Sequence, residues 1–333
     1  MKKYFLSLVV AMMAATATFA QNNLVATLSH GETVSMYYGI SALRNAHNAA
    51  VSGDVINLSG GTFNAVDITK AVTLRGTGID DPLPTYIGGS FTINIPTSDE
   101  NRIMMEGIRC TSTITMNGTF SSAYFLKCKF ESFSYNSNSA INTTIFADCK
   151  ITNNVYLRGN NNVQFINSYV QGFENNSETT ATAFFLNCVV VPYSESGGNL
   201  GYIKNSQLLN SIISVKSNSG YSLPSNTIVL NCLSVNNSFA FTNSQINRDC
   251  KKASFADVFK DFTGSYSDSQ TFELTDEAKA SFLGNDGTQM GMYGGVMPYN
   301  STPSYPQITT MNVANKATAD GKLSVEIEVS AAE

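Results

Sequence analysis

Several residue types are scarce in this chain of 333 residues. It contains no tryptophan, two histidines, eight prolines and six cysteines, and only 14% of its residues are charged. An ordinary soluble domain has about 25% charged residues. The formal net charge is −5 and no run of lysines or arginines occurs, which argues against binding to nucleic acid or to an anionic membrane surface. The hydrophobic share of 43% is enough for a sizeable core and excludes disorder as the main state.

Motifs for metal-dependent or nucleophilic catalysis are also missing. The two histidines, His30 and His47, both precede the repeats described below. The cysteines lie at least 18 residues apart, unlike the C-x₂₋₄-C spacing of zinc sites. No G-x-S-x-G segment or phosphate-binding glycine loop is present. We therefore expect no metal and no cofactor.

The longest apolar run lies at the N-terminus. Lys2 and Lys3 precede apolar residues from Tyr4 to about Ala15, and small residues then lead to Ala20. This order is typical of a secretory signal, so we expect residues 1–20 to be a signal peptide and the mature protein to be exported. The run is too short to span a bilayer core of ~30 Å. No later apolar run approaches 18 residues, so we expect no membrane span.

A repeat of about twenty residues organises the middle of the chain. Its segments begin with Phe, Leu or Val and end with Cys or Ser, at residues 125–128, 146–149, 165–168, 185–188, 208–211 and 229–232. Segments 107–110 and 247–250 align at the two ends, which places all six cysteines in one column. Alternation at period two indicates strands. Short strands and turns repeated in this way predict a solenoid in which like side chains stack in ladders.

For two columns of this repeat we make specific predictions. The Cys/Ser column is expected to point into the core as free thiols and hydroxyls, with disulfides between neighbouring coils as the alternative. The column just before it holds asparagines, and we expect these to form a buried ladder of side-chain amides inside a bend. Its members are Asn167, Asn187, Asn210 and Asn231. Asn161, outside this column, is expected to lie on the surface.

With these repeats the chain resembles the secreted bacterial right-handed parallel β-helices of the pectate-lyase-like superfamily. Segment 41–46, followed by 53–58 and 68–76, is similar to the cap helix and first coil of that family. The resemblance, over about residues 38–250, implies an all-β fold. We expect an N-terminal cap over 21–52, a right-handed parallel β-helix solenoid over 53–252, and a short β and irregular capping segment over 253–333. Many chemistries occur on this scaffold, so the resemblance says little about activity.

Charged residues gather in the first half of the repeats. The alignment places Arg109, Lys127 and Asp148 in one column, and Lys129 and Lys150 in another. Polysaccharide lyases of the resembling family need a cation to neutralise a uronate, so the four basic residues are the candidate catalytic residues if this protein is a lyase. The alternative is a ladder of surface ion pairs, each worth ~0–1 kcal/mol.

Further apolar residues alternate with the core residues along the strands, so they are predicted to point to the outer side of the sheets. These apolar columns contain Ile108, Leu126, Ile166, Leu186, Leu209 and Leu230, beside Tyr169, Val189, Ile212 and Leu233. Exposed apolar ladders are usually covered or bind a partner. A short helix predicted over 254–262 carries Phe255, Val258, Phe259 and Phe262 on one stripe. We expect the C-terminal segment to cover the apolar columns, and otherwise a partner to do so.

The chain also has fifteen tyrosines and many amides, which suit the stacking and hydrogen bonding of sugars. We therefore expect a secreted, non-catalytic β-helix that presents a face to a glycan or another surface molecule. Two alternatives stay open. One is a polysaccharide lyase acting on acidic glycans, and the other is an assembly or adhesin subunit that docks through its final strand and the apolar columns.

Overall fold

The structure, a computed structural model, describes residues 24–80, 82–175, 180–192, 203–214, 226–235, 246–313, 320–322 and 325–330. The expected signal peptide, residues 1–20, lies outside these ranges. Among the helices that are described, none has the length and apolar character needed to cross a membrane.

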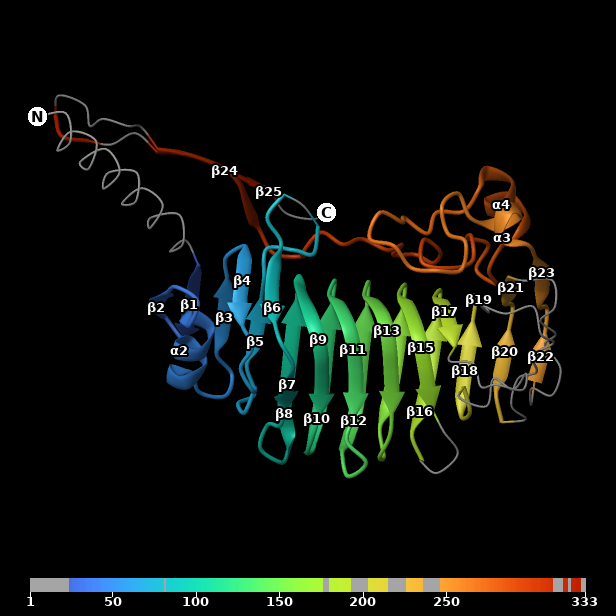
Figure 1. The fold of residues 1–333 in the computed structure, drawn as a ribbon, viewed down its shortest axis with the longest axis horizontal. Coiled ribbons are helices and arrows are strands. Elements are labelled where there is room, and N and C mark those ends of the chain that lie inside the picture. The colour runs from blue at the N-terminus through green and yellow to red at the C-terminus, as the bar shows by residue number, and fades with distance from the viewer. Residues whose placement is uncertain are drawn as a thin grey trace, which may run out of the picture.

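Two sheets pack face to face around one hydrophobic core (Figure 1). Sheet A has 12 strands: β1 (Val25–His30), β2 (Thr33–Tyr38), β3 (Val55–Leu58), β5 (Thr73–Arg75), β8 (Ser98–Glu106), β10 (Thr119–Leu126), β12 (Ala140–Ala147), β14 (Asn162–Ile166), β16 (Thr182–Leu186), β18 (Ser206–Leu209), β20 (Ile228–Leu230) and β22 (Ile246–Arg248). Sheet B has 11: β4 (Gly61–Asn64), β6 (Thr85–Gly88), β7 (Phe91–Ile93), β9 (Ile108–Met116), β11 (Lys129–Tyr135), β13 (Lys150–Leu157), β15 (Tyr169–Asn175), β17 (Val189–Pro192), β19 (Ile212–Ser214), β21 (Leu233–Val235) and β23 (Lys251–Ala253).

From β8 onward the chain alternates between the sheets, and each strand pairs in parallel with the strand one coil earlier. The result is a parallel β-solenoid of about eight turns, which confirms the predicted all-β fold.

The N-terminal end of the solenoid carries a hairpin and a short helix. Strand β1 pairs in antiparallel fashion with both β2 and β3. Helix α2 (Ala42–Ala49) buries Leu43 and His47, among others, on one face. The ammonium of Lys70 donates to the carbonyls of His47, Asn48 and Ala50 at the end of this helix. His47 accepts a hydrogen bond from the backbone of Thr69 and has a structural role here.

A ladder of phenylalanines fills the core. Phe125, Phe146, Phe165 and Phe185 occupy matching positions on β10, β12, β14 and β16. Their rings stack with centroids 4.8–5.0 Å apart, which matches the spacing of paired strands. Phe130 and Phe133 of sheet B meet Phe125 edge-on. The repeat seen in the sequence is therefore a physical stack of like side chains.

The corner between a sheet A strand and the next sheet B strand requires a left-handed backbone. The corner residues have φ between 46° and 65°, and they are Gly107, Lys127, Asp148, Asn167, Asn187, Asn210, Asn231 and Asp249. Glycine, asparagine and aspartate adopt this conformation at low cost, which explains the asparagine column. Burial of Asn167, Asn187 and Asn210 is confirmed. The predicted ladder of amides is mostly wrong, because among the described residues only Asn231 donates to another column member, Asn210.

The residue after each corner points into the core, as predicted for the Cys/Ser column. The thiol of Cys149 donates to the carbonyls of Ala147 and Phe125, and the hydroxyl of Ser168 donates to the equivalent carbonyl of Ile166 at 2.7 Å. Cysteine and serine therefore make the same hydrogen bond at this position of the coil. All six cysteines are free thiols. The placement of Cys110 in this column is wrong, because its strand partner is Phe130 and Gly107 occupies the corner in its coil.

Asn161 is not a surface residue, contrary to the expectation. Its side chain is 1% exposed. Its Oδ1 accepts from the backbone N–H of Ile141 at 2.8 Å, and its Nδ2 donates to the hydroxyl of Ser139 at 2.9 Å. This amide joins two successive coils at the turn opposite the corner.

After β23 the chain turns back along the solenoid (Figure 1). This covering segment, residues 254–306, contains α3 (Phe255–Val258) and α4 (Asp276–Ser281), and it leads to the antiparallel pair β24 (Gln307–Val313) and β25 (Val325–Ser330). Helix α3 is shorter than the predicted helix over 254–262. Near its end the segment reaches the first coils, where Tyr305 bonds to the carbonyl of Gly76 and Ser304 to Glu106.

The covering segment buries part of the apolar columns. On sheet B, a second hydrophobic cluster joins Tyr169, Val189, Ile212 and Leu233 to Val258, Phe259, Phe262 and Phe272, as predicted. The columns on sheet A differ, since Leu126, Ile166, Leu186, Leu209 and Leu230 remain half-buried. Ile108 was expected to face outward but is fully buried in the main core, because it directly follows the corner at Gly107.

Candidate functional site

Three of the predicted basic residues lie side by side on the outer face of sheet B. Strand register pairs Lys129 with Arg109 on one side and with Lys150 on the other. Lys127 lies apart from them at a corner, next to Asp148 of the following coil. The predicted grouping of Arg109 with Lys127 is therefore wrong. The reason is the same as for Cys110, because Gly107 is the corner residue of that coil.

Two of the three cations on sheet B, Arg109 and Lys129, have anionic partners. Asp268 of the covering segment forms an ion pair with Lys129 and lies 3.9 Å from Nη1 of Arg109. Asp80 lies 4.0 Å from Nη2 of Arg109, and the hydroxyl of Tyr86 accepts from Nη1 at 3.1 Å. The hydrogen bond from Lys129 is the main cause that lowers the pKa of Asp268, so this carboxylate stays ionised.

Aromatic rings of the covering segment complete the surroundings of the two lysines. The ammonium of Lys150 lies 5.4 Å from the ring centre of Tyr299 and 5.9 Å from that of Phe272. Lys129 lies 5.3 Å from the ring centre of Tyr266. Burial is the main cause that lowers the pKa of Lys150, although Asp80 opposes the shift. Cation–π contacts of this kind stabilise an ammonium that has lost water.

A small cavity of about 290 Å³ remains beside these residues, lined in part by Tyr86, Arg109, Lys129, Glu131 and Asp268. Lyase chemistry needs a cation that is open to the uronate carboxylate. Here the carboxylate of Asp268 already occupies the position between Arg109 and Lys129. A uronate carboxylate would therefore have to compete with Asp268 for these two cations.

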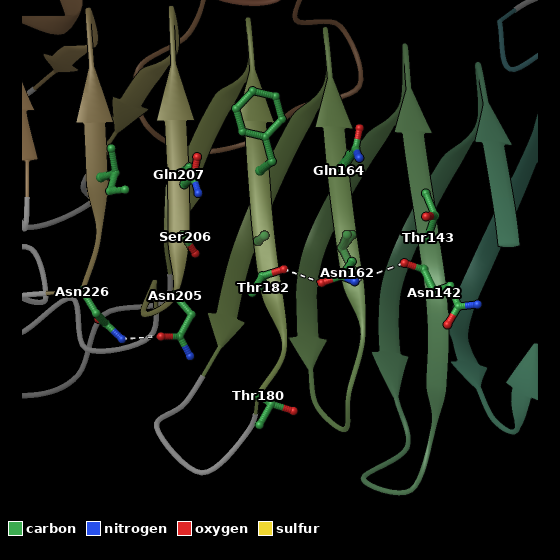
Figure 2. A pocket seen from close by; sticks show the side chains of 14 residues that line it. Asn142, Thr143, Asn162, Gln164, Thr180, Thr182, Asn205, Ser206, Gln207 and Asn226 are labelled. Atoms are coloured by element: carbon green, nitrogen blue, oxygen red, sulfur yellow. Dashed lines mark hydrogen bonds between the residues drawn. The ribbon is translucent and has the colours of Figure 1, made fainter. Parts of the chain in front are cut away.

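A second, larger concavity lies on the outer face of sheet A. This groove has a volume of about 770 Å³ and crosses strands β12, β14, β16, β18 and β20 (Figure 2). It is lined by Asn142, Thr143, Asn162, Val163, Gln164, Thr180, Thr182, Ala183, Phe184, Asn205, Ser206, Gln207, Asn226 and Ile228. None of these side chains is ionisable, and most carry an amide or a hydroxyl.

Register organises the groove into rows. Gln164, Phe184 and Gln207 are consecutive partners on β14, β16 and β18, so an aromatic ring stands between two amides. Within the described residues neither glutamine side chain has a hydrogen-bond partner, and both stand on the strands in Figure 2. A second row is linked internally, because Thr182 donates to Oδ1 of Asn162 at 2.6 Å and Asn162 donates to the carbonyl of Asn142.

The sequence analysis did not find the groove, because it noted the many amides without assigning them to any strand. A usable signal was the alternation of outward positions, since Gln164, Phe184 and Gln207 each lie one residue before a core position. Recognising the row requires the register between coils of unequal length. That register follows from the corners, which are separated by 18–23 residues from Asn167 onward.

In comparisons with known proteins, no family model, curated protein or solved structure matches this chain. Among the described residues, no group of three His, Cys, Asp or Glu side chains is placed to hold a metal ion.

Proposed function

We propose that the protein is exported and binds an extended, neutral glycan in the groove on sheet A. The observation that carries the proposal is the row of Gln164, Phe184 and Gln207. It places an aromatic ring between two amides that have no hydrogen-bond partner in the part of the chain that the structure describes. Export is supported by the signal-like sequence of residues 1–20. We also propose that the protein is related to the pectate-lyase-like superfamily, and the parallel coils of the solenoid support this.

The chemistry of the groove favours a sugar. A primary amide offers donors and an acceptor together, and a sugar hydroxyl uses both. The face of an aromatic ring suits the apolar C–H face of a pyranose ring. The lining has no charge, so an acidic polysaccharide gains nothing from it electrostatically, whereas a neutral one has no charge to desolvate.

The charged cluster on sheet B is a weaker candidate. Arg109 and Lys129 are paired with Asp268 or Asp80. The ammonium groups of Lys129 and Lys150 lie against the rings of Tyr266, Phe272 and Tyr299. These contacts favour a role in holding the covering segment over a role in lyase catalysis.

Affinity electrophoresis and calorimetry with neutral and acidic polysaccharides test the proposal, with unsaturated products monitored in parallel. Phe184→Ala should weaken binding of a neutral glycan about tenfold, which corresponds to ~1.4 kcal/mol. Gln164→Ala and Gln207→Ala should each weaken it as well. Tyr156→Ala is the matched control, because Tyr156 is a half-buried aromatic residue on the opposite sheet.

Binding that survives Phe184→Ala unchanged would show that the groove is not the site. Unsaturated product from an acidic glycan, lost in Lys129→Ala, would favour the lyase instead. A chain that binds no polysaccharide at all would contradict the proposal and favour an assembly subunit.

A further inference from the structure

Cys232 and Cys250 are neighbours on the last two described coils. Each follows a left-handed corner residue, Asn231 and Asp249, and the next residues in the two strands, Leu233 and Lys251, are register partners. Partners in a parallel sheet lie about 4.8 Å apart. This separation falls within the ~4.4–6.8 Å between Cα atoms that a disulfide requires.

One member of this pair, Cys250, differs from the other cysteines in access, whereas Cys232 is buried as they are. Cys128 and Cys149 also occupy neighbouring coils, but both are fully buried. Cys250 is partly exposed, because β22 and β23 end their sheets and no further coil covers them among the described residues. A dissolved oxidant can therefore reach Cys250 in the folded protein, whereas it cannot reach Cys128 or Cys149.

Cys250 is also held less firmly by the backbone. Its sulfur lies 3.5 Å from the carbonyl oxygen of Arg248 and 3.9 Å from that of Val229. The equivalent distances for Cys149 are 3.3 and 3.2 Å. The thiol of Cys232 is within hydrogen-bonding reach of the Cys250 sulfur, and this bond is the main cause that lowers the pKa of Cys250. Thiolate is the form that attacks disulfides.

We propose that Cys232 and Cys250 are a redox site that closes to a disulfide between the last two coils. The oxidant is a low-molecular-weight disulfide, of the kind that oxidising compartments contain. The thiolate of Cys250 attacks one sulfur of that molecule, which breaks its S–S bond and releases one thiolate. Cys232, which is buried beside it, then attacks the Cys250 sulfur and passes its proton to the departing sulfur, which leaves as the second small thiol. Two protein thiols become one disulfide, and one small disulfide becomes two thiols.

The bond would secure the end of the solenoid from which the covering segment departs. Strand β23 ends at Ala253, and the covering segment begins at the next residue. A cross-link between the last two coils opposes separation of β21 from β23 and therefore keeps the start of the covering segment in place. The inference is independent of glycan binding, because neither cysteine lines the groove.

The experiment exposes the folded full chain to oxidised glutathione and then maps its cysteines by alkylation, proteolysis and mass spectrometry. The expected product has lost two hydrogens and contains a peptide pair linked through Cys232 and Cys250. Its thermal midpoint should be higher than that of the reduced protein, and a reductant should reverse the shift. Cys128, Cys149 and Cys188 should be alkylated only after unfolding.

Three variants make the result decisive. Cys232→Ser should stop at a glutathione adduct on Cys250, and Cys250→Ser should give no adduct and no link. Cys188→Ser is the matched control and should form the link as the parent does. Serine occupies the same position at Ser168 and Ser211, so all three variants should fold. A parent protein that stops at the adduct, stays unmodified, or links Cys128 to Cys149 equally would overturn the proposal.

Discussion

The side-chain amide of Asn167 donates to the backbone carbonyl of Met292 at 2.8 Å, across 125 residues of sequence. The same nitrogen donates to the carbonyl of Gly294. Asn210 acts in the same way at the corner two coils further along, where it bonds to Asn285 through both its side-chain oxygen and its side-chain nitrogen. The corner asparagines thus have two roles. Their backbone makes the left-handed turn, and their amides hold the covering segment against the solenoid.

Two substitutions at Asn167 should separate these roles. Asn167→Gly keeps the left-handed backbone and removes the bonds to Met292 and Gly294. The carbonyl of Met292 still accepts from the backbone N–H of Tyr299, so the expected loss of about 1–3 kcal/mol comes mainly from the buried carbonyl of Gly294. Asn167→Ala should cost about 1 kcal/mol more, because alanine resists the left-handed conformation. Denaturant unfolding gives both values. Equal stability of the two variants would mean that backbone conformation does not matter at this corner.

The core ladder should be far more sensitive to substitution than the cysteine column. Phe165→Ala removes a ring that stacks on both Phe146 and Phe185, and we expect a loss of about 3–5 kcal/mol from the resulting cavity. Cys149→Ser should change the free energy of unfolding by less than about 1 kcal/mol, since serine fills the equivalent position at Ser168 and donates to the equivalent carbonyl. A large loss in Cys149→Ser would show that the thiol packs in a way that serine cannot.

Asp148 should make the stability of the protein depend on pH. Burial is the main cause that raises its pKa to about 6, partly opposed by Lys127 and by a backbone bond from Asn300. A carboxyl group with a raised pKa is stabilised in its protonated form by folding. Its contribution is complete below its unfolded pKa, near 4, and is lost as pH rises through about 6. The full change is at most about 3 kcal/mol, at ~1.36 kcal/mol per pKa unit.

Asp148→Asn removes this titration and inserts the residue that four other corners use. The variant should be more stable than the parent at pH 7.5, and its stability should vary less between about pH 4 and 6. Asp249→Asn is the matched control, because Asp249 is an exposed corner aspartate. Chemical denaturation across this pH range checks the prediction. A parent protein that becomes steadily more stable as pH rises from 4 to 6 would contradict it.

Asn161 should be intolerant of an apolar replacement. Asn161→Leu removes the acceptor for the backbone N–H of Ile141 and the donor to Ser139. The buried N–H of Ile141 is then left without this acceptor, which should cost about 1–3 kcal/mol, whereas the hydroxyl of Ser139 keeps its bond to the carbonyl of Asn136. Asn160→Leu is a suitable control, since Asn160 is next to Asn161 in the sequence and its own side chain is exposed. Circular dichroism melts of the two variants should differ clearly, and similar melts would mean that water replaces the lost partners.

The sequence alone determined the class of fold and most of its inner columns. Core positions such as Phe146 and Cys149 recur at a nearly constant interval, and a local alternation of period two is enough to identify strands. The covering of Tyr169 and Leu233 was also predictable, because an apolar outward position and the apolar stripe of Phe259 and Phe262 each require burial. These inferences need only the local pattern and the cost of exposing apolar surface.

Register and long-range contacts were decided by the tertiary structure. Cys110 and Arg109 were assigned to the wrong columns because glycine at position 107 takes the corner that asparagine, aspartate or lysine takes elsewhere. Residue type alone does not reveal this equivalence. The partners of Asn167, the pairing of Lys129 with Asp268 and the row through Phe184 join residues that are distant in sequence. Strand pairing fixes which side chains become neighbours, and the path of the covering segment fixes which of them are buried. Neither is encoded within a single repeat.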